Sequence, residues 1–526
     1  MPSSNKKDKI KELLKKHHEI LSQSHISKLF SEDINRAKKF TTQFSDLYVD
    51  YSKNFITNET LDLLLQYAAS SNLETTINAM FKGEKINHTE DRAALHVALR
   101  GKSKLKLENI EIENDIKNEL KKIKSFVCDV HEKKITGWTN KSFDTFVNIG
   151  AGGSDLGSKM AVKGLAEYRL GNTHSFFISN VDPDEIESIK KKINPETTLF
   201  IISSKSSSTL ETITNANTLK SWMVESGCKN INKHFFVVSS NMKLIKDFGL
   251  SEDNLFKIWD WVGGRFSLWS AAGLPTALAI GFENFEKMLT GAFAMDQHFL
   301  NESPQNNIPV ILALIDFWYI RFFNTSTHAL IPYDESLRYL PEHLAQLFME
   351  SNGKSTDLSG RKINHETGSI AWGTVGTNAQ HSISQLLHQG KHLIPIDFLV
   401  PLQKNGDQQH HQLLLANCLA QSRALMLGEN NSKMHLHFEG SRPSTTILYK
   451  KLTPKLLGTL IAMYEHRVFI QGKLLEVNPF DQFGVELGKK ITLDVLESIK
   501  DKKSMSELDS STKNLIAIYK NHKKTE

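Results

Sequence analysis

Between Asp144 and Val238 the chain alternates short apolar runs with longer amphipathic segments, and this alternation constrains the fold more than any other feature. A short apolar run suits a buried strand, whereas apolar residues at spacings of three and four suit a helix. Strands separated by helices pair in parallel, because each helix returns the chain to the same end of the sheet. The region therefore predicts a parallel sheet with crossover helices. The expected strands are 145–149, 175–178, 198–202 and 235–238, and the expected helices are 156–168, 183–193 and 210–224.

A second region with the same alternation follows, so we predict a second α/β domain. The residues before it differ, because residues 1 to about 106 show helical periodicity and few strand-like runs. The residues from Gly484 onward are charged and helical. We expect helices at 8–21, 91–100 and 410–427, and strands at 329–332 and 393–400. The resulting division is an N-terminal helical segment at 1–106 that packs on the larger domain, a smaller α/β domain at 107–277, a larger α/β domain at 278–483, and a C-terminal helical arm at 484–526.

The composition indicates a globular protein without a membrane anchor. The chain has 526 residues, of which 40% are hydrophobic and 23% charged. Its longest apolar stretches, 309–315 and 271–282, are shorter than the roughly 18 residues of a membrane helix. The charged N-terminus lacks the apolar core of a secretory signal, and three widely spaced cysteines form no disulfide framework. We therefore expect a cytoplasmic protein with no membrane partner. A net charge of +5 does not indicate a nucleic-acid partner.

A glycine-rich turn, Asn148-Ile-Gly-Ala-Gly-Gly-Ser-Asp-Leu-Gly157, follows the first expected strand. In a doubly wound sheet, ligands bind at the carboxyl ends of the strands, where glycines bring backbone N–H groups close to the ligand. The letters fit neither a dinucleotide fingerprint, which needs glycine at Asp155, nor a Walker A loop, which needs Lys-Ser/Thr after Gly157. A tight turn with a helix cap and no ligand is the alternative interpretation.

A second turn, Ser203-Ser-Lys-Ser-Ser-Ser-Thr209, follows the expected strand at 198–202. It places several hydroxyls and one ammonium group at the start of a helix, where the positive helix end also favours an anion. We therefore expect this turn to bind a phosphate. The alternative is a flexible serine-rich loop, although such linkers seldom separate a strand from an amphipathic helix.

Two further segments place an acid and a base beside turns. Glu350 lies in Met349–Lys354, and His381 ends Gly376–His381. Aldose–ketose isomerisation needs a base that moves a proton between adjacent carbons, a cation that stabilises the enediolate, and an acid–base pair that opens the sugar ring. It requires no metal and no other cofactor. A lone glutamate or histidine is more often a surface residue or a satisfied core group, so these two residues do not establish the chemistry by themselves.

Seven segments in order make the chain similar to the glucose-6-phosphate isomerase family, from about Thr89 to about Lys490. The resemblance implies two doubly wound parallel-sheet sugar-isomerase (SIS-type) domains with flanking helices and a C-terminal helical arm. It implies an enzyme that interconverts glucose 6-phosphate and fructose 6-phosphate through ring opening and a cis-enediol(ate), in glycolysis and gluconeogenesis. The segments are Thr89–Arg100, Gly152–Gly157, Ser204–Thr212, Trp259–Trp269, Met349–Lys354, Gly376–Gly390 and Phe480–Lys489.

The resemblance also implies a role for each matching residue. Glu350 is expected to carry the proton between C1 and C2, and Arg265 to face the enediolate. His381 and Lys489 are expected to transfer protons in ring opening, with Glu211 orienting His381. The smaller α/β domain is expected to bind the sugar phosphate. The expected substrate contacts are Gly153, Ser154, Ser204, Lys205, Ser206 and Thr209 around the phosphate, with Gln346 and Gln482 elsewhere on the substrate.

The chain departs from the family pattern at several positions. Ser206-Ser207-Ser208 replaces the usual Thr-Phe-Thr but keeps a hydroxyl at 206. Thr374 and Val375 replace the Glu-Pro of the family near His381. Asp91 and Ala379 stand where glycine is common. None of these departures removes a proposed catalytic group, but they alter the local geometry and can alter the rate.

Several alternatives stay open at this level. A sugar-phosphate-binding regulator with an inert site would keep the fold, but it has no need for four catalytic groups. An isomerase of another phosphosugar would differ only in pocket shape. The Trp259–Trp269 segment suits a stacking platform, although core packing is the more common role. His388 has no acid or cysteine to complete a metal site with His381, so we interpret it as structural.

The resemblance finally implies a homodimer in which His381 reaches the active site of the other subunit. Each site would then be built at the interface between subunits, and a monomer would be inactive.

Overall fold

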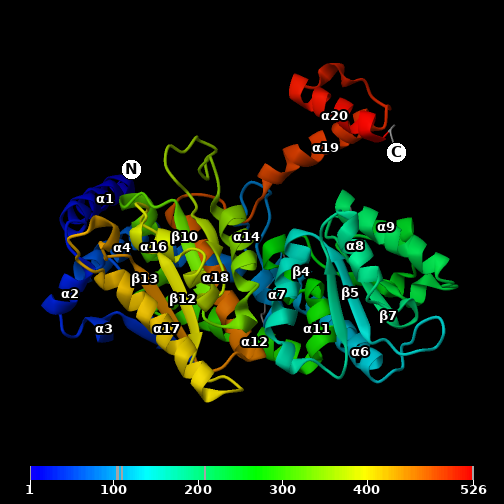
Figure 1. Cartoon of the computed structure of the whole chain (residues 1–526), viewed down its shortest axis with the longest axis horizontal. Coiled ribbons are helices and arrows are strands. Elements are labelled where there is room, and N and C mark those ends of the chain that lie inside the picture. Colours follow the sequence, from blue (N-terminus) through cyan, green and yellow to red (C-terminus); the bar gives the residue numbers. More distant parts are fainter. Residues whose placement is uncertain (1, 102–105, 108–109, 207–208, 524–526) are drawn as a thin grey trace. The chain divides into compact units, whose positions relative to one another are not determined.

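The computed structural model describes residues 2–101, 106–107, 110–206 and 209–523. Its contacts divide the chain into two compact units, Met1–Pro479 and Phe480–Glu526. The first unit combines helices with two main sheets, one of five strands and one of six (Figure 1). The predicted α/β class with parallel sheets is confirmed. The domain boundaries expected within residues 1–483 stay predictions.

The smaller sheet has the strand order β6-β5-β7-β8-β9, and all neighbouring strands pair in parallel. Parallel pairing brings the carboxyl ends of β5 and β7 to the same edge, where Gly150 lies opposite Ser203. The turns that follow these two strands therefore start side by side. The strands are β5 Thr145–Gly150, β6 His174–Ile178, β7 Thr198–Ser203, β8 Phe235–Ser239 and β9 Leu255–Lys257, and the helices between them are α7 Leu156–Gly164, α8 Pro183–Lys190, α9 Leu210–Glu225 and α10 Lys243–Phe248.

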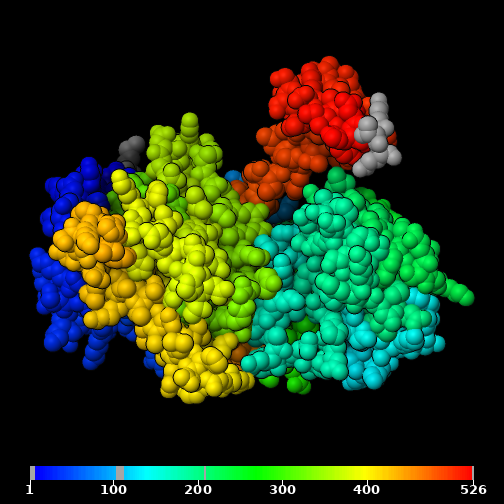
Figure 2. Space-filling view, viewed as in Figure 1, coloured from blue at the N-terminus to red at the C-terminus, as the bar shows by residue number. Residues whose placement is uncertain are grey.

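The larger sheet has the order β1-β2-β13-β12-β10-β11 and is mixed. Its last four strands pair in parallel, whereas β2 is antiparallel to both β13 and β1. Helix α17 (Gln408–Leu427) contacts β12, and its yellow atoms form part of the visible surface (Figures 1 and 2). The strands are β1 Thr41–Phe44, β2 Leu47–Lys53, β10 Thr327–Pro332, β11 Ile370–Gly373, β12 Ile396–Pro401 and β13 Ser444–Tyr449.

The hairpin of β1 and β2 lies inside the segment for which we predicted helices. In β2, Leu47, Val49 and Tyr51 are buried in alternation with more exposed residues, which is the period of a half-buried strand. The second edge of β2 pairs with β13, which lies far away in the sequence. The helix expected at 91–100 is also largely wrong, because only a 3-10 turn at His96–Leu99 forms there.

Helices α12 and α18 cross closely in the interior of the first unit. A Cβ atom on Gly291 of α12 would lie 1.7 Å from the Lys455 carbonyl oxygen, and one on Gly458 of α18 would lie 1.9 Å from the Met288 carbonyl oxygen. Each helix therefore needs glycine where the other approaches. The remaining bounds are α1 Pro2–Leu21, α2 Ile26–Glu32, α3 Arg36–Lys39, α4 Asn58–Ser70, α5 Leu73–Lys82, α6 Glu113–His131, α11 Leu274–Ile280, α12 Phe282–Asn301, α13 Ile308–Phe322, α14 Leu340–Asn352, α15 Gly376–Gln380, α16 Ser384–Gln389 and α18 Pro454–Leu474, with a small pair β3 Lys106–Leu107 and β4 Ile110–Glu111.

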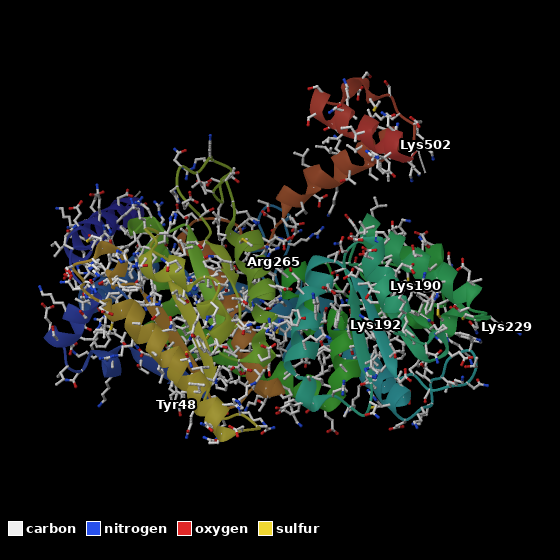
Figure 3. The ribbon with its side chains drawn as sticks, viewed as in Figure 1. Tyr48, Lys190, Lys192, Lys229, Arg265 and Lys502 are labelled. Atoms are coloured by element: carbon white, nitrogen blue, oxygen red, sulfur yellow. The ribbon has the colours of Figure 1, made fainter. Side chains whose placement is uncertain are left out.

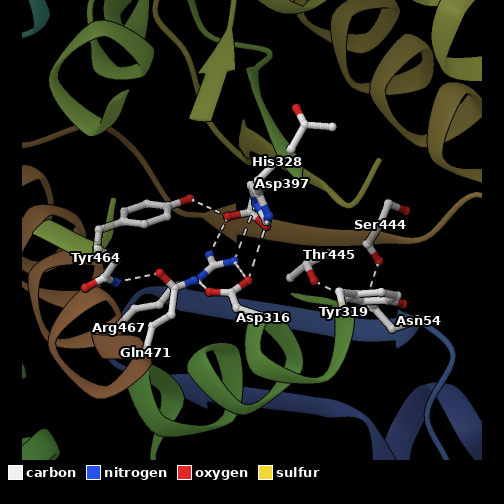
Figure 4. Close-up of polar contacts among 12 residues, drawn as sticks. Asn54, Asp316, Tyr319, His328, Asp397, Ser444, Thr445, Tyr464, Arg467 and Gln471 are labelled. Atoms are coloured by element: carbon white, nitrogen blue, oxygen red, sulfur yellow. Dashed lines mark hydrogen bonds and ion pairs between the residues drawn. The ribbon is translucent and has the colours of Figure 1, made fainter. Parts of the chain in front are cut away.

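Arg467 of α18 lies buried between two carboxylates (Figure 4). It donates to Asp316 of α13 through Nε and Nη2 at 2.7 Å each, and to Asp397 of β12 through Nη1 at 2.5 Å. The Tyr464 hydroxyl donates to Asp397 at 3.0 Å. Burial acts to raise the pKa of Asp397, but Arg467 and His328 hold it below its ordinary value. These contacts tie α18 and α13 to the larger sheet.

The second unit contains α19 (Glu486–Ile499) and α20 (Ser510–Lys523), as the charged helical pattern predicts. In the parts of the chain that the structure describes, no helix is both long enough and apolar enough to cross a membrane.

Candidate active site

The two predicted phosphate-binding turns follow β5 and β7 at one edge of the smaller sheet. After β5, a 3-10 turn at Gly152–Ser154 leads into α7. Gly152 has a φ of +56°, a backbone conformation that favours glycine. The Asn148 amide donates to the Ser154 carbonyl oxygen at 3.0 Å and holds the turn against the strand. This arrangement leaves backbone N–H groups at the start of a helix, as anion sites require.

Gly153 brings this turn against the segment that carries Arg265. A Cβ atom on Gly153 would lie 2.2 Å from both the carbonyl carbon and the oxygen of Gly264, and 2.7 Å from the backbone nitrogen of Arg265. The Ser267 hydroxyl donates to the Gly153 carbonyl oxygen at 3.2 Å. Only glycine at 153 permits this close approach.

The turn after β7 contacts the same segment. The Lys205 ammonium group donates to the carbonyl oxygens of Asp260 at 2.9 Å and Val262 at 2.8 Å, and burial lowers the pKa of Lys205. The Ser204 hydroxyl lies 3.5 Å from the Thr209 hydroxyl, across the turn that also contains Ser206. Ser207 and Ser208 lie outside the described residues. Both predicted phosphate turns therefore converge on the residues just before Arg265.

Arg265, labelled in Figure 3, is buried, and its guanidinium contacts groups from several segments of the chain. Its Nε donates to the Ser351 hydroxyl at 2.7 Å, and its Nη2 donates to the Pro479 carbonyl oxygen at 2.5 Å. Its Nη1 lies 3.6 Å from Glu350 Oε2. The guanidinium is therefore held by its supports while one face approaches the predicted base.

Glu350 and Gln346 lie one turn apart on α14, and the Gln346 amide donates to Glu350 Oε2 at 2.8 Å. The Gln346 amide nitrogen is also 3.2 Å from the place of a Cβ atom on Gly152. The Glu350 side chain is 21% exposed, whereas the Arg265 side chain is 1% exposed. The structure thus brings Gly152, Gly153, Arg265, Gln346 and Glu350 together, and Glu350 stays accessible to a ligand.

Sequence reasoning missed the residues that hold this end of α14. Asn352 is fully buried and donates from its amide to the Gln471 side chain at 2.6 Å and to the Val468 carbonyl oxygen at 3.1 Å. The Lys354 ammonium donates to the Glu350 carbonyl oxygen at 2.8 Å. The Met349–Lys354 motif contains all three supporting residues, Ser351, Asn352 and Lys354. The motif was therefore the signal in the sequence that could have identified them.

Other predicted site residues lie outside this cluster. His381 follows α15 and is exposed, and its ring makes no hydrogen bond with the residues that the structure describes. Glu211, in the first turn of α9, is also exposed. Gln482 and Lys489 belong to the second compact unit, where Lys489 Nζ lies 3.0 Å from Glu486 Oε1. The roles of these four residues stay predictions.

The tryptophan-rich segment before and around Arg265 is part of the core, as the packing interpretation predicted. Trp269 is fully buried and donates from Nε1 to Glu465 Oε1 at 3.0 Å. The Arg100 guanidinium lies over its ring at 4.4 Å, and Trp259 and Trp261 stack on each other at 5.0 Å. These rings are buried and packed, so they do not form an open platform for stacking.

Two departures from the family pattern have visible structural consequences. Asp91 adopts a φ of +50°, so it keeps the backbone conformation that glycine usually supplies. Ala379 is buried in α15, where its methyl group packs in the core of the larger sheet. Both positions therefore accept a side chain without removing a local fold element.

Comparison with known proteins decides what family this geometry belongs to. The family model for phosphoglucose isomerase matches residues 50–516. The chain belongs to the phosphoglucose isomerase family.

Relatives and solved structures agree with this membership in the phosphoglucose isomerase family. The chain is 44% identical to the glucose-6-phosphate isomerase of Campylobacter jejuni subsp. doylei, covering 97% of each chain. It is 44% identical to that of Helicobacter pylori strain HPAG1, over 97% of this chain and 98% of the relative. A crystal structure of a glucose-6-phosphate isomerase from Chlamydia trachomatis superposes with a TM-score of 0.86 at 30% identity, over 96% of this chain and 97% of the other. The resemblance of the seven sequence segments is confirmed.

Proposed function

We propose that the chain is an aldose–ketose isomerase that interconverts glucose 6-phosphate and fructose 6-phosphate, in glycolysis and gluconeogenesis. The observation that carries the proposal is the pairing of Glu350 with Arg265 beside two turns suited to a phosphate. Membership in the phosphoglucose isomerase family over most of the chain supports the same reaction.

Glu350 acts in this proposal as the base for proton transfer. In the open-chain sugar, its carboxylate removes the C2 proton of the aldose, and the C1 carbonyl oxygen becomes the enediolate oxygen. The hydroxyl proton on O2 moves to O1, and the resulting carboxylic acid returns the carbon-bound proton to C1, which leaves a carbonyl at C2 and yields the ketose. Arg265 stabilises the enediolate charge, and its buried position strengthens that interaction because little water screens it. The hydrogen bond from Gln346 orients Glu350 without neutralising it.

The phosphate of the substrate binds at the turns after β5 and β7 in this proposal. Backbone N–H groups at a helix start and several hydroxyls donate to the phosphate oxygens. The Lys205 ammonium adds positive charge from a position held by two carbonyl oxygens. The contacts are Gly153, Ser154, Ser204, Lys205, Ser206 and Thr209, with Gln346 and Gln482 on the sugar.

Ring opening needs a second acid–base pair, for which we propose His381 and Lys489 with Glu211 as the orienting group. The exposed His381 ring supports a role in the site of a second subunit, and so does the exposed apolar surface of the C-terminal unit at Phe483 and Leu487. A homodimer with a shared site is therefore part of the proposal. We also propose a cytoplasmic location.

Conversion of fructose 6-phosphate to glucose 6-phosphate, coupled to a dehydrogenase, tests the function. The Glu350→Gln variant should lose about 10³-fold in kcat, because an amide cannot accept the proton. Glu342→Gln is the matched control, since Glu342 lies on the same helix and is 55% exposed, and its kcat should equal that of the wild type. The assay is repeated with a chelator, and activity should persist.

Two outcomes would contradict the proposal. A fully active Glu350→Gln variant would exclude Glu350 as the base. A folded wild-type protein that shows no turnover, but is protected by sugar phosphates against thermal unfolding, would favour an inert sugar-phosphate binder instead.

A further inference from the structure

A polar cavity of about 270 Å³ lies in the first unit, apart from the residues assigned to the substrate. It is formed by α1, the turn between α4 and α5, the loop after α14 and the C-terminal end of α18. Its volume is below the roughly 300 Å³ at which pockets for drug-sized ligands begin, so its ligand must be small. The lining residues are Lys7, Ser70, Ser71, Asn72, Asp357, Leu358, Ser359, Arg361, Lys473 and Glu476.

The charges around this cavity favour an anion. Two of its three cations are paired, Lys7 with Glu476 at 2.5 Å and Arg361 with Asp357 at 2.9 Å. The third, Lys473, makes no ion pair or side-chain hydrogen bond with the residues that the structure describes. The cavity lining therefore holds three cations against two carboxylates, and the excess charge is positive.

The surroundings of Lys473 make that charge costly without a ligand. Burial and the nearby Lys7 ammonium both lower the pKa of Lys473, and together they outweigh the Glu476 carboxylate, which acts to raise it. A bound anion would reverse both effects, because it would replace lost hydration and offset the repulsion. The Ser359 hydroxyl lines the same cavity and can donate to an anion, whereas the Ser70 and Ser71 hydroxyls already donate to the Tyr67 carbonyl oxygen.

We propose that this cavity binds a phosphate dianion, through Lys473, Lys7 and the Ser359 hydroxyl, and that its occupancy lowers the rate of isomerisation. The dianion is either free phosphate or the phosphate group of a small metabolite. The binding is independent of the chain's activity, whereas the effect on rate rests on the proposed function.

The walls of the cavity connect directly to the supports of the catalytic pair. The Leu358 N–H donates to the Glu476 carbonyl oxygen at 3.0 Å, so the loop after α14 is attached to the end of α18. That loop begins just after Glu350. Pro479 lies three residues after Glu476, in the segment that follows α18. Its carbonyl oxygen accepts a hydrogen bond from Arg265.

A ligand at Lys473 therefore acts on both partners of the proposed reaction. A phosphate competes with Glu476 for the Lys7 ammonium and moves the chain that leads to Pro479. A small displacement of that carbonyl changes the position of the Arg265 guanidinium, and rates fall steeply when catalytic groups shift. The expected result of binding is a lower kcat.

Isothermal titration calorimetry of the full-length chain in phosphate-free buffer tests binding. Inorganic phosphate and glycerol 3-phosphate are titrated separately, so that free phosphate and a phosphomonoester are distinguished. The wild type should show two sites, one in the substrate turns and one in the cavity. Lys473→Gln should lose the second site or bind there about tenfold more weakly. Retention of the first site shows that the variant is folded.

Lys163→Gln is the matched control, because burial also lowers the pKa of Lys163 but it does not line the cavity. It should bind both probes as the wild type does. Binding by Lys473→Gln that superposes on the wild type, with either probe, overturns the proposal.

The effect on rate has its own measurement. In the wild type, phosphate should raise KM by competing at the substrate site and should also lower kcat about fivefold at saturation. In Lys473→Gln only the effect on KM should remain. If phosphate changes only KM in both proteins, the proposed effect of the cavity on rate is overturned. A chain without any isomerase activity would instead contradict the proposed function and would leave the binding result intact.

Discussion

Replacing Gly153 by alanine should separate the phosphate turn from the segment that carries Arg265. The new Cβ atom would lie 2.2 Å from the carbonyl carbon of Gly264, whereas ordinary contacts begin near 3.4 Å. Both obstructing groups are backbone, so one backbone must move by about 1 Å. Overpacking of this kind costs about 1–3 kcal/mol of stability. A 1 Å misplacement of catalytic groups costs about 10²-fold in rate.

The assay is the coupled isomerase measurement together with urea unfolding of the same preparations. Gly264→Ala is the matched control, because a Cβ atom at Gly264 meets nothing within 4 Å on the other side of the same contact. The control should unfold as the wild type does. The reasoning is refuted if Gly153→Ala keeps both wild-type kcat and wild-type stability, or if the two variants are destabilised equally.

Three further perturbations test other contacts. Ser351→Ala removes the acceptor of the Arg265 Nε and should lower kcat about tenfold with little change in KM, measured by steady-state kinetics; an unchanged kcat would show that the Ser351 hydroxyl is not needed to position the guanidinium. His343 is buried with its pKa lowered to about 4, so its stabilising contribution is present above pH 6.5 and is lost as the pH falls toward 4. When the pH is lowered from 7 to 5, the free energy of unfolding should therefore fall by about 2 kcal/mol less in His343→Leu than in the wild type. Parallel plots of unfolding free energy against pH for the two proteins would contradict this. Arg467→Met leaves two buried carboxylates without their cation and should cost about 3–5 kcal/mol in urea unfolding, so a loss below 1 kcal/mol would count against a paired buried network.

The parallel sheet was predictable because its signals are local. Strands at 145–149, 198–202 and 235–238 are short apolar runs between amphipathic helices, and each forms within a residue or two of its expected bounds. The positions of the two turns that we propose for phosphate were predictable for the same reason, since their glycines and hydroxyls follow a strand directly. By contrast, β2 and β13 become neighbours only through a long-range antiparallel pairing, which no local period reveals.

The amino-acid sequence by itself identified the family and the α/β class, because these depend on residue type and order. It also singled out the segments that carry Glu350, Arg265 and His381 as candidates for the site. Only the tertiary structure decided which groups meet and what holds them. Gly153 fits against Gly264, Ser351 supports Arg265, and Asn352 anchors the end of α14 on α18. Each of these contacts joins segments far apart in the chain and requires backbones and side chains to meet within a few ångströms. That geometry results from packing of the whole unit, so it cannot be derived from any one segment.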